Sequence, residues 1–252
     1  MRKPIIAGNW KLNKTPHEAL LLVNELKREI TDVENADIVL CPPFTALGEV
    51  ADALTDTNIA LGAQNIFWED AGAFTGEISG PMLKDLGVSY VIVGHSERRQ
   101  YFHETNETVN KRIRAALKHG LTPIVCVGEN LAQREGNKTF DVIKDHCEGA
   151  FAGLLAEDVK KTIIAYEPVW AIGTGKTASP DQAQEVHAFI RDLLKKHFGV
   201  EVSESLRIQY GGSVTPDNIV ALINKPDVDG ALVGGQSLKS ASFAAIVKGA
   251  KR

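Results

Sequence analysis

Four polar side chains that could move protons or bind an anion stand at the ends of apolar runs in this sequence. Asn9 and Lys11 come at the end of the first run, His95 follows another, and Glu167 follows a third. A carboxylate can act as a general base, an imidazole exchanges protons near neutral pH, and a lysine supplies positive charge. Each residue alone is more often structural, but together they suit proton transfer on a small anionic substrate.

The most informative stretch surrounds Glu167. The apolar run 162–166 ends at this carboxylate, Pro168 and two bulky residues follow, and a Gly-Thr-Gly-Lys segment comes next. Ser179 then matches the N-cap of a capping box, with proline at the first helical position. A base beneath a loop with stiff ends and a flexible middle is typical of a site closed by a lid. The stretch alone is equally compatible with a surface carboxylate before an ordinary loop.

Glycine-rich turns supply candidate anion sites. Gly211, Gly212 and Ser213 follow one apolar run, and Gly234 and Gly235 follow the last one. Small residues let backbone N–H groups approach an anion, and a helix that starts nearby adds a favourable dipole. These two turns therefore predict a phosphate site.

Two nucleotide-binding motifs are excluded. Segment 175–177 resembles the end of a P-loop, but Trp170 stands where that motif requires glycine. Segment 173–178 resembles a dinucleotide fingerprint, but Pro168 and Trp170 separate it from its strand and it opens no helix directly. Neither pattern predicts a nucleotide cofactor.

Short apolar segments alternate with helical patterns along the whole chain. The expected strands cover 4–11, 36–41, 59–64, 90–94, 123–127, 162–166, 206–210 and 231–233. Their continuous apolar character is typical of parallel strands that are buried on both faces. A repeat of roughly 30 residues fits a βα unit. The pattern predicts an α/β fold, a (β/α)₈ TIM barrel in which residues 1–252 form a single domain. An open doubly wound sheet is disfavoured because no glycine fingerprint follows the first strand.

Helix signals agree with this alternation. The expected helices cover 15–30, 45–54, 81–87, 105–119, 139–155, 182–198 and 240–248, and a further short helix opens at 215–216. Thr15 begins a capping box, while Gly120 and Gly199 are expected just past helix ends. In such a barrel, active sites lie at the carboxyl ends of the strands. The polar residues and glycine turns described above all fall at these ends.

Composition excludes several classes of protein. The chain of 252 residues has a net charge of −4 and no run of basic residues, so we expect no nucleic acid or membrane surface as a partner. No apolar stretch approaches the ~20 residues of a transmembrane helix. The N-terminus lacks the apolar core of a signal peptide, and the three cysteines form no CxxC pair. We expect reduced thiols and a cytoplasmic location. The histidines have no metal-ligand spacing, so we expect no metal.

One segment interrupts the repeat. The chain from Asn65 to Ser79 is long for a connection, contains glycines and carries Phe67, Trp68 and Phe74. A loop of this size has little core of its own, so its aromatic residues pack either on the barrel or in another subunit. We favour the contact with another subunit.

The chain resembles the triosephosphate isomerase family along its whole length. The matching stretches are AGNWK at 7–11, GEIS at 76–79, VGHSERR at 93–99, AYEPVWAIGTG at 165–175, YGGSV at 210–214 and LVGG at 232–235. The stretches around His95 and Glu167 are highly specific together. Gln236 stands where the family usually has a small residue, and Ala7 stands where glycine is more usual.

The resemblance implies a reaction and roles for these residues. The reaction interconverts dihydroxyacetone phosphate and glyceraldehyde 3-phosphate through an enediolate. Glu167 would move the carbon proton, and His95 would polarise the carbonyl near a helix that starts at Ser96 and Glu97. Lys11 would stabilise the phosphate and the developing oxyanion, with Asn9 bonding the same oxygens. The backbone N–H groups of Gly173, Ser213, Gly234 and Gly235 would bind the phosphate. No cofactor or metal is implied.

The resemblance also implies a homodimer. Segment 65–79 would insert into the neighbouring subunit and place Thr75 close to Asn9, Lys11 and His95 of the partner subunit. The alternative function is that of an aldolase-type phosphate-binding barrel, in which Lys11 would form a Schiff base with the substrate.

Overall fold

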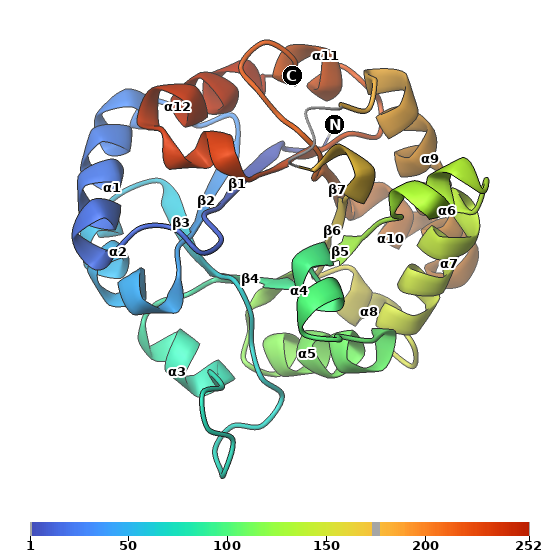
Figure 1. The fold of residues 1–252 in the computed structure, drawn as a ribbon, viewed down its shortest axis with the longest axis horizontal. Coiled ribbons are helices and arrows are strands. Elements are labelled where there is room, and N and C mark those ends of the chain that lie inside the picture. The colour runs from blue at the N-terminus through green and yellow to red at the C-terminus, as the bar shows by residue number, and fades with distance from the viewer. Residues whose placement is uncertain (1, 173–176, 252) are drawn as a thin grey trace.

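The computed structural model describes residues 2–172 and 177–251, and in this part of the chain eight parallel strands close into a barrel (Figure 1). The strands are β1 (Ile5–Asn9), β2 (Asp37–Cys41), β3 (Ile59–Ala63), β4 (Tyr90–Val93), β5 (Thr122–Val127), β6 (Ile163–Tyr166), β7 (Arg207–Tyr210) and β8 (Gly230–Val233). They pair in sequence order, and β1 closes the ring against β8. The predicted (β/α)₈ barrel is confirmed.

Alternate residues of the strands face the barrel axis. One apolar cluster contains Ile5, Ala7, Val39, Cys41, Ile92, Ile124, Cys126, Ile163, Ala165 and Leu232, which are spaced two apart within each strand. The residues between them belong to a larger cluster shared with the surrounding helices. Because strand side chains alternate, the same series continues to Asn9, Glu167 and Gly234 at the carboxyl ends. The strand period therefore directs these three residues to the inner side of the rim.

Most helices surround the barrel as an outer layer, while α4 begins at the carboxyl rim of the strands (Figure 1). They are α1 (Pro16–Ile30), α2 (Leu47–Leu54), α3 (Gly80–Asp85), α4 (Ser96–Tyr101), α5 (Asn106–Lys118), α6 (Leu131–Glu135), α7 (Thr139–Ala150), α8 (Ala156–Val159), α9 (Pro180–Phe198), α10 (Val200–Ser205), α11 (Ile219–Ile223) and α12 (Ser240–Gly249), with 3₁₀ turns η1 (Phe44–Ala46), η2 (Val169–Ala171) and η3 (Gly235–Leu238). The predicted capping boxes at Thr15 and Ser179 are present. Gly120 and Gly199 have the positive φ angles expected past helix ends. None of the described helices is long and apolar enough to cross a membrane.

Several predicted boundaries are wrong. The strand predicted over 4–11 ends at Asn9, and Lys11 has a left-handed backbone with φ of 53°. The helix predicted over 139–155 ends at Ala150, where the Asn110 amide of α5 donates a hydrogen bond to the Ala150 carbonyl. The short helix predicted from 215 begins only at Ile219. Helices α6, α8 and α10 were not predicted, since all three are too short to show a helical period.

An ionic network joins elements at the amino-terminal rim. The Arg191 guanidinium on α9 bonds Asp229 at 2.7 Å and Asp227 at 2.6 Å, and Arg2 bonds Asp229 at 2.8 Å. Arg191 also donates to the backbone carbonyls of Ser203 and Leu206. Because the charged groups are paired and hydrogen-bonded, their burial is tolerated. The network ties α9 and α10 to the segment that leads into β8.

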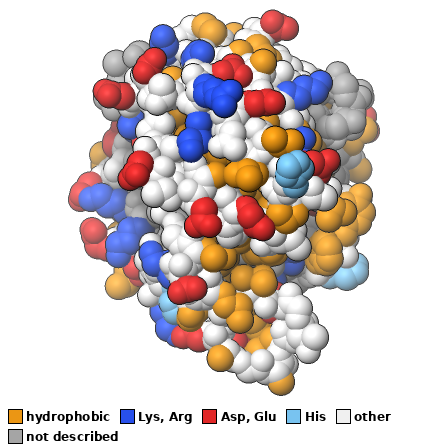
Figure 2. Space-filling view, turned by 90° about the vertical axis from the view of Figure 1, so that its left-hand side faces the viewer, with side chains coloured by type: hydrophobic (Ala, Val, Ile, Leu, Met, Phe, Trp, Pro, Cys, Tyr) orange, Lys and Arg blue, Asp and Glu red, His pale blue; other side chains and the backbone are white. Residues whose placement is uncertain are grey.

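The segment between β3 and α3 projects from the barrel, and Figure 2 shows apolar side chains on this projecting part. Phe67 is 8% exposed and stacks on Trp68 at 4.1 Å and Phe74 at 4.8 Å between ring centroids. The Arg112 guanidinium of α5 lies 4.9 Å from the Trp68 ring. Phe74 remains 43% exposed. The expectation that all three aromatic residues need another subunit is therefore wrong for Phe67, which packs within its own chain.

The buried side chain of His187 predicts a loss of stability in acid. Its Nδ1 lies 3.0 Å from the Asp227 carbonyl oxygen, and its Nε2 has no partner among the described residues. Burial lowers the pKa of His187 to about 4. An unfolded histidine binds its proton near pH 6.5, so the unfolded state takes up more protons between about pH 6.5 and 4. Stability must therefore fall as the pH falls through this window.

We expect the free energy of unfolding to decrease by about 2–3 kcal/mol for this one group between pH 7 and about pH 4.5. His187→Phe should make the pH dependence shallower by that amount, whatever it does to stability at pH 7. Urea unfolding of both proteins at the two pH values measures the difference. Equal slopes in the two proteins would contradict the assignment.

Candidate active site

One cavity at the carboxyl ends of the strands collects most of the residues predicted from the sequence. It has a volume of about 260 Å³. Its lining comprises Asn9, Lys11, His95, Glu167, Ile172, Gly211, Gly212, Ser213, Val214, Leu232, Gly234, Gly235 and Gln236. Carboxylate, imidazole, ammonium and glycine turns therefore face a common space. Gly173, which was expected to bind phosphate, lies outside the described residues.

Glu167 and His95 form the polar centre of this cavity. Glu167 is 2% exposed, and its Oε1 lies 2.9 Å from His95 Nε2. The backbone N–H of Ser96 donates to Glu167 Oε2 at 2.9 Å, and the Ser96 hydroxyl lies 3.3 Å from Oε1. Burial acts to raise the pKa of Glu167, but His95 and the Ser96 N–H outweigh it and hold this pKa below its ordinary value. The carboxylate is thus ionised at neutral pH and aimed into the cavity.

The short helix α4 determines which nitrogen of His95 carries a proton. His95 is the N-cap of α4, and its Nδ1 accepts the backbone N–H of Glu97 at 3.2 Å. An accepting Nδ1 has no proton, so the ring proton is on Nε2 and points at Glu167. Burial acts to lower the pKa of His95, but the adjacent Glu167 carboxylate raises it above the usual value. The imidazole is therefore a hydrogen-bond donor toward the cavity.

Lys11 is placed in the cavity by an unusual backbone. Its N–H donates to Asn9 Oδ1 at 3.0 Å, which supports the left-handed φ angle that few residues other than glycine adopt. The Gln64 side chain donates to the carbonyls of both Lys11 and Cys41 at 2.9 Å. Lys11 Nζ then reaches Glu97 Oε1 at 2.6 Å. Sequence reasoning missed Gln64, although it continues the inward-facing series beyond β3.

The opposite wall consists of glycine turns. The Gly211 N–H donates to the Tyr166 carbonyl at 2.7 Å, and a Cβ at Gly211 would approach Glu167 Cγ to 3.0 Å. At Gly212 a Cβ would lie 2.2 Å from the Tyr210 hydroxyl oxygen. A Cβ at Gly234 would lie 3.6 Å from Lys11 Cε. A side chain at position 212 would thus collide with the Tyr210 hydroxyl. At Gly234, the absence of a side chain leaves the backbone accessible beside Lys11.

A buried carboxylate that sequence reasoning missed holds the start of the loop after Glu167. Glu129 Oε1 accepts the Trp170 indole N–H at 2.9 Å and the Tyr166 hydroxyl at 3.1 Å. The Val169 N–H donates to the Glu129 carbonyl at 3.0 Å. Burial raises the pKa of Glu129 above its ordinary value. The only sequence signal for Glu129 is its position after β5, which places it at the same rim as Glu167.

Thr75 is not part of this cavity within one chain, because it lies exposed near the tip of the projecting segment. A larger groove of about 760 Å³ adjoins the cavity and shares Asn9, Lys11 and His95 with it. Its other lining residues include Leu12, Phe44, Gln64, Asn65, Glu97, Tyr101 and Phe102. Leu12 is 97% exposed, and Tyr101 and Phe102 are each 65% exposed. The groove is thus a largely apolar surface directly beside the polar centre.

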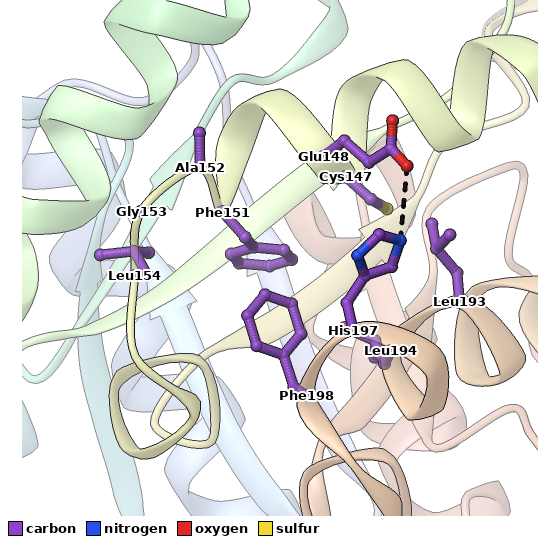
Figure 3. Close-up of a pocket in the computed structure, with 10 residues that line it drawn as sticks. All are labelled: Cys147, Glu148, Phe151, Ala152, Gly153, Leu154, Leu193, Leu194, His197 and Phe198. Carbon is purple, nitrogen blue, oxygen red and sulfur yellow. Dashed lines mark ion pairs between the residues drawn. The ribbon is translucent and has the colours of Figure 1, made fainter.

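A separate hollow of about 320 Å³ lies between the carboxyl-terminal ends of α7 and α9 (Figure 3). Phe151 and Phe198 meet edge to face inside it, and His197 pairs with Glu148 at 3.4 Å. Its lining is largely apolar and, unlike that of the cavity at the carboxyl rim, has no buried carboxylate beside glycine turns. Among the described residues, no group of three or more His, Cys, Asp or Glu could hold a metal ion.

Comparison with known proteins agrees with this geometry. A family model described as triosephosphate isomerase matches residues 4–250. Triosephosphate isomerase of Carboxydothermus hydrogenoformans is 60% identical over 249 residues, covering 99% of both chains. The enzyme of Alkaliphilus oremlandii is 59% identical over 247 residues, covering 98% of this chain and 99% of the relative. That of Endomicrobium trichonymphae is 57% identical over 251 residues, covering 100% of both chains. This chain belongs to the triosephosphate isomerase family of enzymes.

Proposed function

We propose that this chain interconverts dihydroxyacetone phosphate and glyceraldehyde 3-phosphate through an enediolate, with Glu167 as the base. The observation that carries the proposal is the 2.9 Å contact between a buried carboxylate and an imidazole Nε2 in a cavity walled by glycine turns. The family membership supports the same reaction. The free, buried thiols of Cys41, Cys126 and Cys147 suit a reducing compartment, so we place the reaction in the cytoplasm.

Glu167 removes a proton from one substrate carbon and returns it to the neighbouring carbon. Its lowered pKa keeps it ionised and ready to accept the proton. His95 donates a hydrogen bond from Nε2 to the substrate oxygens. Burial opposes the charged form of His95 and the Glu167 carboxylate favours it, so when Glu167 takes the substrate proton the balance shifts toward neutral imidazole.

Lys11 and the glycine turns bind the phosphate on the other side. The Lys11 stem lies beside Gly234, so one ammonium group serves the phosphate and the oxyanion that develops on the substrate. Asn9 bonds the same oxygens, and the backbone N–H groups of Ser213, Gly234 and Gly235, together with Gly173, complete the phosphate site. Ser96 and Glu97 support the reacting pair through their backbone N–H groups.

The loop that begins at Pro168 acts as the lid of this site. Its first residues are held by the hydrogen bonds of Glu129, and its last residues lead into the Ser179 capping box. Ile172 lines the cavity, so the loop contributes directly to its wall. A lid that excludes water strengthens the electrostatic contacts inside and protects the enediolate.

Lys11 is poorly suited to the Schiff-base alternative. A Schiff base requires an amine that is free to attack the substrate carbonyl, whereas Lys11 Nζ is held by Glu97 Oε1 at 2.6 Å. The isomerase assignment is therefore preferred over an aldolase-type reaction.

We also propose that the enzyme is a homodimer in which the projecting segment 65–79 enters the groove of the partner subunit. The groove is largely apolar and borders Lys11 and His95, and the segment presents Phe74 and Thr75 at its exposed end. Burying the exposed aromatic surface of Tyr101 and Phe102 would stabilise the assembly by about 25 cal/mol per Å². The neighbouring subunit would then help to hold Lys11 in place.

A coupled assay with glyceraldehyde 3-phosphate tests the proposed reaction directly. The purified chain should form dihydroxyacetone phosphate without added metal or cofactor. Absence of conversion above the buffer rate would overturn the function, and covalent trapping of substrate by borohydride would favour the aldolase alternative.

Glu167→Asp should slow turnover by about 10²-fold, because the shorter side chain withdraws the carboxylate by about 1 Å from the substrate carbon. Binding of inorganic phosphate as a competitive inhibitor should be nearly unchanged, since the phosphate site lies on other strands. Steady-state kinetics and circular dichroism measure both effects. Full turnover by a folded mutant would remove Glu167 from the role of base.

Thr75→Arg should place a bulky cation next to Lys11 of the partner subunit and thereby weaken the dimer. We expect sedimentation as a monomer at low protein concentration and loss of most activity, with unchanged helical content. Thr55→Arg is the matched control, since Thr55 is exposed and precedes β3, at the amino-terminal rim of the barrel. A Thr75→Arg enzyme that stays dimeric and active would place Thr75 outside the interface.

A further inference from the structure

The short segment after β5 connects the base of the reaction to helix α7. The Glu167 N–H donates to the Val127 carbonyl at 2.8 Å, and the Val169 N–H donates to the Glu129 carbonyl at 3.0 Å. Between these two bonds, the Gly128 N–H points the other way and donates to His146 Nδ1 on α7 at 3.3 Å. Segment 127–129 is thus bonded to the base and to the start of the lid on one side, and to one imidazole on the other.

Gly128 is in direct contact with the Glu167 backbone. A Cβ at Gly128 would lie 1.7 Å from the Glu167 carbonyl oxygen and 2.7 Å from its carbonyl carbon. No other residue type fits in this space, so the two peptides cannot move independently. Any shift of Gly128 must therefore displace the backbone from which the Glu167 carboxylate extends.

His146 acts here as a hydrogen-bond acceptor, which requires a lone pair on Nδ1 and a neutral ring. The charged groups that face it are Arg99 on α4, Asp145 on its own helix and Glu167. Arg99 and Asp145 are bridged by Asn106, whose side chain bonds each at 2.8 Å. Burial, followed by the Arg99 charge, lowers the pKa of His146 to about 4. The ring thus keeps its accepting nitrogen throughout the neutral pH range.

We propose that His146 is a positioning residue for the isomerase reaction: by accepting the Gly128 N–H, it sets the position of the Glu167 backbone and of the first residues of the lid. This inference rests on the proposed function. It predicts that the accepting atom matters, rather than the bulk of the imidazole. Loss of the acceptor should impair proton transfer and leave the phosphate site intact, because that site is built by β7, β8 and Lys11.

Two substitutions test whether the accepting nitrogen of His146 or the bulk of its ring is what matters. His146→Asn places an amide oxygen near the position of Nδ1 and keeps an acceptor, whereas His146→Leu keeps the volume and removes it. We expect kcat of the leucine variant to fall about tenfold, a smaller loss than the ~10² expected for a 1 Å displacement of a reacting group. The asparagine variant should stay within about threefold of wild type, and inhibition by inorganic phosphate should change less than about twofold in both. His197→Leu, at the exposed end of α9, is the control and should not change kcat.

The pH dependence provides a second readout that holds even if the leucine variant does not fold. Initial rates followed by proton NMR need no coupling enzyme. The ratio of kcat of the asparagine variant to that of wild type should be constant above about pH 6 and rise about twofold near pH 4, where half of the His146 rings are protonated. A ratio of the two kcat values that does not change down to pH 4 would overturn the role of His146. A folded leucine variant with wild-type kcat would also overturn it. An inactive wild-type enzyme would instead overturn the proposed function itself.

Discussion

Closure of the strand ring is the constraint on which the rest of the structure depends. Because β1 pairs with β8 and all strands are parallel, the carboxyl ends of β1, β4, β6, β7 and β8 meet at one rim. The inward-facing series of β1, β6 and β8 then end at this rim in Asn9, Glu167 and Gly234. An open sheet with the same strands would leave the first and last of these groups on opposite edges.

Helix α4 resolves the main electrostatic difficulty at that rim. A carboxylate that is 2% exposed is costly unless hydrogen bonds and charges compensate its lost hydration. The first N–H group of α4 provides part of this compensation, since Ser96 donates to Glu167, while the next one, of Glu97, donates to His95 Nδ1. One short helix therefore positions the Glu167 carboxylate and also selects the tautomer of the imidazole beside it.

The two rims of the barrel hold their charged side chains in place by different means. At the amino-terminal rim, Arg191 is paired with Asp227 and Asp229, and the network connects helices and strands. At the carboxyl rim, Lys11 has a left-handed backbone that Asn9 and Gln64 support by hydrogen bonds. Backbone strain is tolerated where surrounding contacts define a single conformation, and such positions are common at functional sites. Here the strained residue is the one that brings a cation into the cavity.

The sequence by itself determined the barrel and the residue types at its rim. Apolar runs, capping boxes at Thr15 and Ser179, and glycines past helix ends are local signals, and they were correct because local contacts decide them. Only the tertiary structure decided that the helix begun at residue 139 stops at Ala150, because the capping amide of Asn110 comes from another helix. Gln64, Glu129 and His146 were missed for the same reason: each bonds to a backbone or side chain of another element, and only the packing of these neighbouring elements brings them into contact.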